Sequence, residues 1–291
     1  MLASTFATRC LFLLAVLSMV VAAPIPTRLR NARSMIIRDD SNSGSDSDSS
    51  SGSDWDSDSG SSSDTDSNTS VDSDSGTGNS TSTSNVVFAT DLSIDVATII
   101  QSVKFATFNP VPGANYGTGH DDNKAQIYKL DVDGSVGGSV YAVEADMDVD
   151  CDGTDYQCEG NDDGQSETSY GALSAERVPF YVLPQSFVDQ QNIRGNSLGA
   201  IICNNKMFYA IMGDTNGDSP EVIGEASWLL ARTCFPDDDL NGAKGHDQSD
   251  VMYIVFGSLV PGGISEDSPT IDIDSLKELG DKTMKAFKLT S

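Results

Sequence analysis

Two carboxylates, Asp214 and Glu225, are the residues whose types and spacing best suit acid–base chemistry. Asp214 comes at the end of an apolar strand-like stretch and begins a Gly/Asn turn, and Glu225 follows Gly224 at the expected start of a helix. If a loop brings them together, one carboxyl in a less solvated setting can keep its proton as an acid, while the other stays ionised and activates water. The simpler alternative is that Asp214 only caps a turn and Glu225 only favours a helix N-terminus.

A second feature is an alternating acidic run, in which Asp146, Asp148, Asp150 and Asp152 are separated by single residues. On an extended strand, residues two apart lie on the same face, so these like charges repel one another. Such a face must meet water, a metal or a cationic ligand, unless Lys or Arg from elsewhere in the fold neutralises it.

The same region also fits the spacing of an EF-hand calcium loop, which would run from Asp148 to Glu159 with Gly153 at its sixth position. An EF-hand needs a helix on each side, but residues 140–143 have strand composition and residues 160–164 form a turn-like segment. We therefore expect no metal and no other cofactor, and calcium binding remains an alternative.

The chain has two histidines, His120 and His246. They do not form the pattern of a typical metalloenzyme, and no Ser or Cys nucleophile motif accompanies them. We expect His246 to be a loop residue held by hydrogen bonds rather than a catalyst.

Four cysteines remain once Cys10 of the N-terminal segment is set aside. An even number in a secreted chain favours two disulfides, for which three pairings are possible. We favour Cys151–Cys158 as a local loop and Cys203–Cys234 as a longer connection. Zinc binding is the rival interpretation, but the spacing matches no zinc-finger pattern.

The elements that must position these residues are mostly strands. Short runs of strand composition, bounded by Gly, Pro, Asn or Asp, predict strands at residues 126–132, 139–149, 178–182, 199–203, 206–212 and 251–256. Apolar periodicity predicts helices at residues 225–233 and 274–288. This pattern predicts a mainly β protein of a single domain with a few short helices, whose strands form either a β-barrel or a β-sandwich.

The composition divides the 291 residues into four segments. Residues 1–23 carry Arg9, an apolar run and small residues, as in a secretory signal, and residues 24–38 are expected to be a pro-segment. Residues 39–84 contain almost only Ser, Asp, Gly and Thr, which predicts a disordered linker. Residues 85–291 are long enough for one folded domain, which we expect to be the catalytic one.

The net charge is −27, with 44 acidic against 17 basic residues. Binding to a nucleic-acid backbone needs clustered Lys and Arg, so nucleic acid is excluded as an expected partner, whereas a cationic partner is favoured. No second hydrophobic span follows residue 23, so no membrane partner is expected. We expect a monomer that is secreted to the extracellular space.

Several motifs, in order, resemble the fungal chitosanases of glycoside hydrolase family 75. They are DMDVDCDG at 146–153, YVLP at 181–184, GDTNG at 213–217, GEAS at 224–227 and GHD at 245–247. The resemblance covers nearly all of residues 100–280. It implies an endo-acting hydrolase that cleaves the β-1,4 linkages of chitosan with inversion.

The resemblance also implies that the two essential carboxylates are Asp214 and Glu225, with Glu225 as general acid and Asp214 as general base. Chitosan is a polyamine, so we expect Asp146, Asp148 and Asp150 to bind its ammonium groups. A strand ending in GDTNG with Gly-Glu after it resembles, at the level of fold alone, a double-psi β-barrel. The alternative function is a non-catalytic acidic protein that binds cell-wall polysaccharide or calcium.

Overall fold

The computed structural model describes residues 86–290 except 107–108, 121, 163 and 266. Its helices are α1 (Val96–Ala106), α2 (Gln185–Gln191), α3 (Trp228–Cys234) and α4 (Ile273–Ala286). Its strands are β1 (Pro110–Gly117), β2 (Lys124–Leu130), β3 (Val140–Asp150), β4 (Phe180–Pro184), β5 (Leu198–Cys203), β6 (Lys206–Asn216), β7 (Glu225–Ser227) and β8 (His246–Phe256). The expected signal, pro-segment and linker lie outside the described residues.

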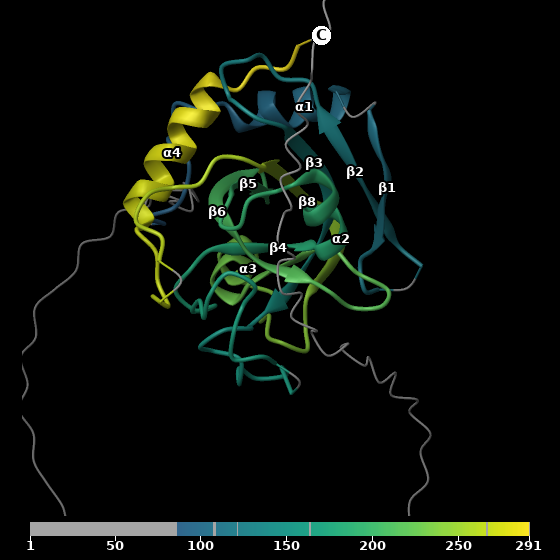
Figure 1. Ribbon diagram of the computed structural model, residues 1–291, viewed down its shortest axis with the longest axis vertical. Coiled ribbons are helices and arrows are strands. Elements are labelled where there is room, and N and C mark those ends of the chain that lie inside the picture. The colour runs from purple at the N-terminus through teal and green to yellow at the C-terminus, as the bar shows by residue number, and fades with distance from the viewer. Residues whose placement is uncertain (1–85, 107–108, 121, 163, 266, 291) are drawn as a thin grey trace, which may run out of the picture. The chain divides into compact units, whose positions relative to one another are not determined.

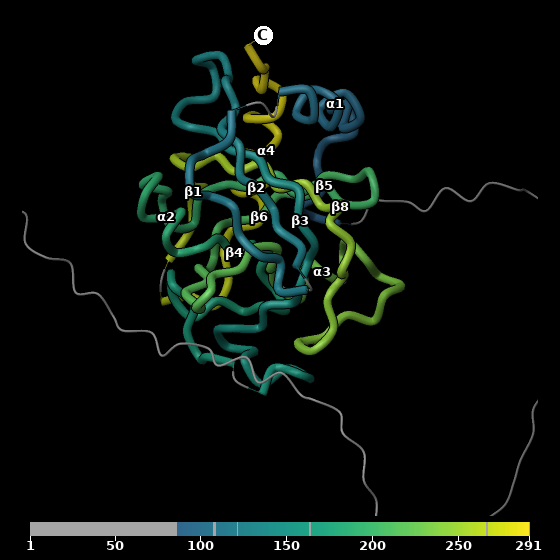
Figure 2. Tube along the Cα trace, turned by 90° about the vertical axis from the view of Figure 1, so that its right-hand side faces the viewer, coloured from purple at the N-terminus to yellow at the C-terminus, as the bar shows by residue number. Residues whose placement is uncertain are grey.

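Six of these strands close into a barrel. They follow the order β3-β7-β4-β6-β5-β8, and β8 pairs back with β3. The pairs β3–β7 and β4–β6 are parallel, and the other neighbouring strands are antiparallel. β2 and β1 extend the sheet from β3, outside the ring (Figures 1 and 2). The predicted mainly β barrel is therefore confirmed. The pairing of β3 with β8 joins the first and last of the six strands into a closed ring, which rules out the sandwich alternative.

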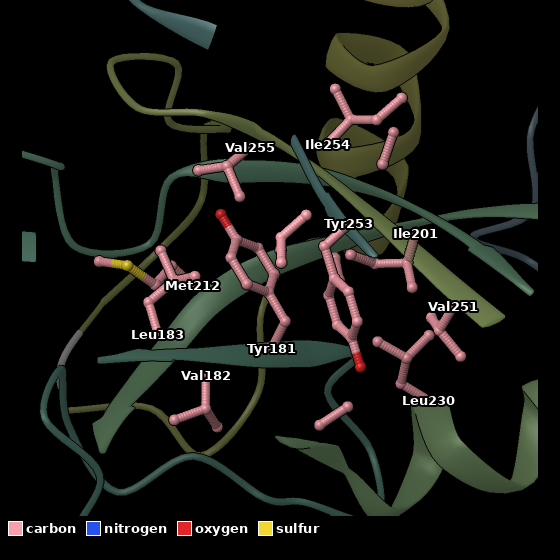
Figure 3. Packing of buried hydrophobic residues seen from close by; sticks show 14 of the residues in the cluster. Tyr181, Val182, Leu183, Ile201, Met212, Leu230, Val251, Tyr253, Ile254 and Val255 are labelled. Carbon is pink, nitrogen blue, oxygen red and sulfur yellow. The ribbon is translucent and has the colours of Figure 1, made fainter. Parts of the chain in front are cut away.

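The barrel interior is filled by side chains that are almost completely buried. β4 and β5 are buried at every residue. The rings of Tyr181 and Tyr253 lie among aliphatic side chains, with their hydroxyl groups pointing in opposite directions (Figure 3). The Tyr181 hydroxyl donates to the carbonyl oxygen of Ser197 at 3.2 Å, and that of Tyr253 to the carbonyl oxygen of Asp146 at 2.7 Å. Tyr253 thus ties the apolar core to the acidic strand β3.

α4 packs against β5 and β6 on the outside of the barrel (Figure 1). Its N-cap is Asp272, whose carboxylate accepts from the backbone N–H of Ser275 at 3.2 Å. Leu276 and Met284 of the predicted apolar stripe are buried. The predicted C-terminal helix is therefore confirmed, with slightly shorter bounds.

The prediction of one helix over residues 225–233 is wrong. Glu225–Ser227 forms β7, which pairs with β3 and β4, and α3 begins only at Trp228. Ser227 explains the break, because its hydroxyl accepts from the backbone N–H of Leu230 and so caps the helix. Two neighbouring strands offer backbone hydrogen bonds to these three residues, which local periodicity does not reveal.

The other strand predictions are confirmed with changed bounds. β6 and β8 are both longer than predicted, β6 at its C-terminal end and β8 at its N-terminal end. β1, α1 and α2 were not predicted. β1 contains two prolines and two glycines, residues that are depleted in strands, which is why its composition did not suggest one.

Both expected disulfides are confirmed. Cys151 is bonded to Cys158, and Cys203 to Cys234. The four sulfur atoms are therefore not zinc ligands. Among the helices of the described residues, none is both long enough and apolar enough to span a bilayer.

Candidate active site

Asp214 and Glu225 come from β6 and β7, the two strands that flank β4 in the barrel. Asp214 and Asn216 are two residues apart on β6, so they project to the same side. The side-chain amide of Asn216 donates to the Glu225 carboxylate at 3.0 Å. The Glu225 carboxylate is therefore bound to a residue that lies two positions after Asp214 on the same strand. Asp214 and Glu225 both differ in setting from the prediction, since each lies within a strand rather than in a turn or at a helix start.

Asp214 is held by several donors. Its Oδ1 accepts hydrogen bonds from the backbone N–H of Ser169 at 2.9 Å and from the backbone N–H of the next residue, Thr215, at 2.6 Å. The Ser169 hydroxyl donates to the same oxygen. Asp214 is 2% exposed and Glu225 is 9% exposed, so both carboxylates are largely shielded from solvent. Such a network fixes the orientation of the Asp214 carboxylate.

Asp150 is affected by the charges of both of these acids. Carboxylate oxygens of Asp150, Asp152 and Asp214 lie within 4.8 Å of one another. Burial raises the pKa of Asp150 well above its ordinary value, and the charges of Asp214, Asp152 and Glu225 add to that effect. The backbone N–H of Asp152 donates to Asp150 at 2.7 Å, and that of Gln165 donates to Asp152 at 2.9 Å. We call Asp150, Asp152, Asp214 and Glu225 the carboxylate cluster.

Asp146 and Asp148 meet His120 instead. His120 Nε2 lies 2.9 Å and 3.1 Å from the two oxygens of Asp148 and 3.8 Å from Asp146 Oδ2. Burial raises the pKa of Asp146 to about 8, and the neighbouring charge of Asp148 adds to the rise. Burial also raises the pKa of Asp148, against the opposing effect of His120. Burial would lower the pKa of His120, but the hydrogen bond with Asp148 and the nearby carboxylates outweigh it and raise the pKa.

The alternating acidic residues therefore do not form one solvent-facing surface. Asp146 and Asp150 are buried, whereas the side chain of Asp148 is 27% exposed. The reason is tertiary, because β3 has a strand partner on both sides, β2 and β7 on one and β8 on the other, and its register with β8 shifts between Ala145 and Met147. The run is divided between two separate acidic groups.

The EF-hand alternative is wrong. Asp148 and Asp150 lie in the strand β3, where an EF-hand would have the end of its first helix and the start of its loop. The Cys151–Cys158 disulfide closes the segment that follows. These residues do not have the helix–loop–helix arrangement that the calcium motif requires.

His246 is held from both sides. Its Nδ1 lies 2.9 Å from Asp238 and its Nε2 lies 3.0 Å from Asp250, while its ring stacks on Phe235 at 3.6 Å between centroids. The expected hydrogen-bonded role is confirmed, although His246 begins β8 instead of lying in a loop.

Sequence reasoning missed three residues of these sites. Asn216 was within the GDTNG motif but had no role assigned to it, and His120 was noted only as one of two histidines. Ser169 gave no signal at all, because nothing in its neighbourhood indicates that it contacts Asp214, 45 residues away.

A family model described as fungal chitosanase of glycosyl hydrolase group 75 matches residues 147–286. Close similarity to individual members extends further along the chain. Endo-chitosanase C of Aspergillus oryzae is 47% identical over 206 residues, which are 69% of this chain and 53% of that protein. An endo-chitosanase of Aspergillus oryzae is 32% identical over 233 residues, which are 69% of this chain and 93% of that protein.

The chain belongs to this family. An endo-chitosanase of Aspergillus fumigatus is a further relative, 32% identical over 189 residues, which are 57% of this chain and 78% of that protein. The chain spans about half the length, 53%, of the endo-chitosanase C to which it is similar. The group 75 match includes Asp148, Asp150, Asp214 and Glu225, whereas His120 and Asp146 precede it.

Proposed function

We propose that this protein is a secreted endo-chitosanase that hydrolyses β-1,4-glucosaminyl linkages of chitosan with inversion at the anomeric carbon. The observation that carries the proposal is the carboxylate cluster itself, in which oxygens of Asp150, Asp152 and Asp214 lie within 4.8 Å of one another and the charges of Asp214 and Glu225 both act on Asp150. Names of the relatives support the substrate, since those proteins are called endo-chitosanases. The strongly acidic composition suits a polyamine.

In the proposed reaction, Glu225 is the general acid and Asp214 the general base. Glu225 donates a proton to the glycosidic oxygen as the bond from that oxygen to the anomeric carbon breaks. Asp214 removes a proton from a water that attacks the same carbon from the opposite face. A base as buried as Asp214 acts on water enclosed with it, and the donors from Ser169 and Thr215 keep the carboxylate oriented for that step.

Substrate binding is proposed for Asp146, Asp148 and Asp150, but in two different ways. Asp148 is partly exposed and can contact a glucosamine ammonium group directly. Asp146 and Asp150 are buried, so we propose that they act through the local field rather than by contact. Asp247, whose side chain is 65% exposed and lies 3.7 Å from His120, extends the acidic surface beside Asp148.

Secretion is proposed from the signal-like residues 1–23. The two disulfides support it, because structural disulfides persist mainly in oxidising compartments.

The decisive experiment is proton NMR of fresh product during digestion of chitosan. An inverting enzyme releases the α-anomer first, and its endo action lowers viscosity faster than reducing ends accumulate. A first product with the β-anomer would overturn inversion. If chitosan is retained by the protein but no product forms, the protein is a binding protein and the enzymatic proposal fails.

A further inference from the structure

Asp146 is a buried carboxylate that makes no hydrogen bond of normal geometry through its side chain. Its side chain is 0% exposed, and its nearest cation is His120, whose Nε2 lies 3.8 Å from Oδ2. The buried Thr118 hydroxyl is close enough to lower the pKa of Asp146, but burial outweighs this effect and the pKa is raised. A buried polar group without a partner is costly, and a site that keeps one calls for a physical reason.

Two further residues with atoms that can bind a metal ion lie beside this carboxylate. His120 Nε2 and carboxylate oxygens of Asp146 and Asp148 all lie within 4.8 Å of one another. The three residues come from the loop before β2 and from β3, so they are brought together only by folding. We call them the His120 site.

The distances in this site fit a tetrahedral dication. Zinc binds imidazole nitrogen and carboxylate oxygen at about 2.0–2.2 Å, which places neighbouring ligand atoms about 3.4 Å apart. His120 Nε2 lies 2.9 Å and 3.1 Å from the Asp148 oxygens and 3.8 Å from Asp146 Oδ2, on either side of that value. An ion could therefore replace the proton now shared by His120 and Asp148 with only small movements.

The backbone approaches the two carboxylates closely at two glycines. A Cβ atom on Gly224 would lie 1.9 Å from Asp146 Oδ1, and one on Gly245 would lie 1.7 Å from Asp148 Oδ1. Glycine at these two positions thus allows the main chain to approach the carboxylates closely and to hold them on either side of His120 Nε2.

The other acidic groups of the described residues are poorer candidates. In the carboxylate cluster, oxygens of Asp150, Asp152 and Asp214 accept from backbone N–H groups. Around His246, both ring nitrogens are already hydrogen-bonded to carboxylates. The His120 site combines an imidazole with two carboxylates, one of which is fully buried and makes no hydrogen bond of normal geometry.

We propose that His120, Asp146 and Asp148 form a binding site for a transition-metal dication of the zinc type. The imidazole favours zinc over calcium, which prefers six to eight oxygen ligands. Bound zinc and a glucosamine ammonium group use the same Asp148 oxygens, so zinc is expected to weaken chitosan binding.

The test is isothermal titration calorimetry of the full-length, chelator-stripped protein with ZnCl2, in excess CaCl2 that occupies non-specific carboxylates. We expect saturable binding of one Zn²⁺ per chain and a rise in Tm, because a ligand that binds the folded state stabilises it. His120→Gln and Asp146→Asn should each weaken binding by at least about 100-fold. His120 is partly exposed on a loop, so His120→Gln remains informative if Asp146→Asn fails to fold.

The matched control is His246→Gln, which alters the other histidine that lies between two carboxylates. It should bind zinc as tightly as the unaltered protein does. The proposal is overturned if no one-to-one binding is seen in excess calcium, if His120→Gln binds as tightly as the parent, or if His246→Gln loses the site to the same extent.

Discussion

Asp148 lies directly opposite Glu225 in the parallel pairing of β3 with β7. The same register sets Asp150 opposite Ser227, the residue that caps α3. Two segments far apart in the sequence, the alternating acidic run and the GEAS motif, therefore form adjoining edges of one site. This register explains why Asp150 is influenced by the charge of Glu225 as well as by that of Asp214.

Replacing either proposed catalytic carboxylate should remove activity without harming the fold. We expect Asp214→Asn and Glu225→Gln each to lower kcat on chitosan by about 10²–10⁴-fold, the usual contribution of a general acid or base. Tm should stay the same or rise, since each change puts a neutral amide of nearly the same size into a crowded, buried acidic group. Initial-rate assays and calorimetry measure both quantities.

The control for these variants is Glu176→Gln, which alters an exposed carboxylate outside the carboxylate cluster. It should leave kcat unchanged. Near-normal rates in Asp214→Asn or Glu225→Gln would show that the assignment of catalytic residues is wrong, even if the protein hydrolyses chitosan.

Added salt should raise the KM for chitosan. The chain has a net charge of −27, and attraction of a polycation by such a surface is screened over about 10 Å at 0.1 M salt and about 3 Å at 1 M. We expect KM to rise several-fold over this range while kcat changes little. Asp247→Asn, which removes a largely exposed charge beside Asp148, should reduce the salt effect. A KM that is independent of salt would contradict electrostatic recognition.

The two disulfides should contribute unequally to stability. Cys203–Cys234 closes a loop with a sequence separation of 31, against 7 for Cys151–Cys158. Loop-closure entropy assigns about 3.7 kcal/mol to the longer loop and about 2.5 kcal/mol to the shorter one. Denaturant unfolding of the two double Cys→Ala variants should therefore show the larger loss for Cys203 and Cys234. The reverse order would mean that lost packing, rather than chain entropy, dominates.

Gly280→Ala should destabilise the protein, although alanine favours helix. In the middle of α4 the change gains about 1 kcal/mol of helix propensity. A Cβ atom at this position would lie only 2.4 Å from the buried ring of Tyr209, and overpacking of that kind costs about 1–3 kcal/mol. We expect a lower Tm than that of Lys282→Ala, an exposed change on the same helix. A higher Tm for Gly280→Ala would show that α4 can move away from β6.

Asp91 should stabilise the fold only above the pH at which an unfolded Asp ionises. Its carboxylate accepts from the backbone N–H of Ser93 at 2.8 Å and pairs with Lys285 of α4 at 3.1 Å. These contacts, the Ser93 hydrogen bonds first, hold its pKa well below the ordinary value. A depressed pKa gives stability that is present above about pH 4 and is lost as the pH falls towards the folded-state pKa.

We therefore expect Asp91→Asn to lower Tm at neutral pH and the difference to shrink as the pH falls below about 4. Thermal unfolding over a pH series measures it. Glu278→Gln, an exposed change on α4, is the comparison and should show no such pH-dependent loss. A Tm difference for Asp91→Asn that stays constant down to the lowest pH would contradict this account.

Local signals in the sequence named the candidate carboxylates. GDTNG and GEAS each place a carboxylate within a few residues of glycine, and the resemblance of these motifs to a known family gave Asp214 and Glu225 their proposed roles. The short separation of Cys151 and Cys158 likewise suggested a disulfide loop. Strand composition and turn residues were sufficient for a mainly β protein, whereas the preference for a barrel came from a resemblance at the level of fold.

The sequence by itself therefore determined the mainly β class, the local Cys151–Cys158 loop and the identity of the two candidate carboxylates, since these depend on neighbours along the chain. Only the tertiary structure decided that Asp146 and Asp150 are buried, that Asp148 meets His120, and that Glu225 belongs to a strand. The physical reason is that burial and parallel pairing depend on which distant strands lie on each side, and a parallel neighbour such as β7 leaves no mark in the sequence of β3.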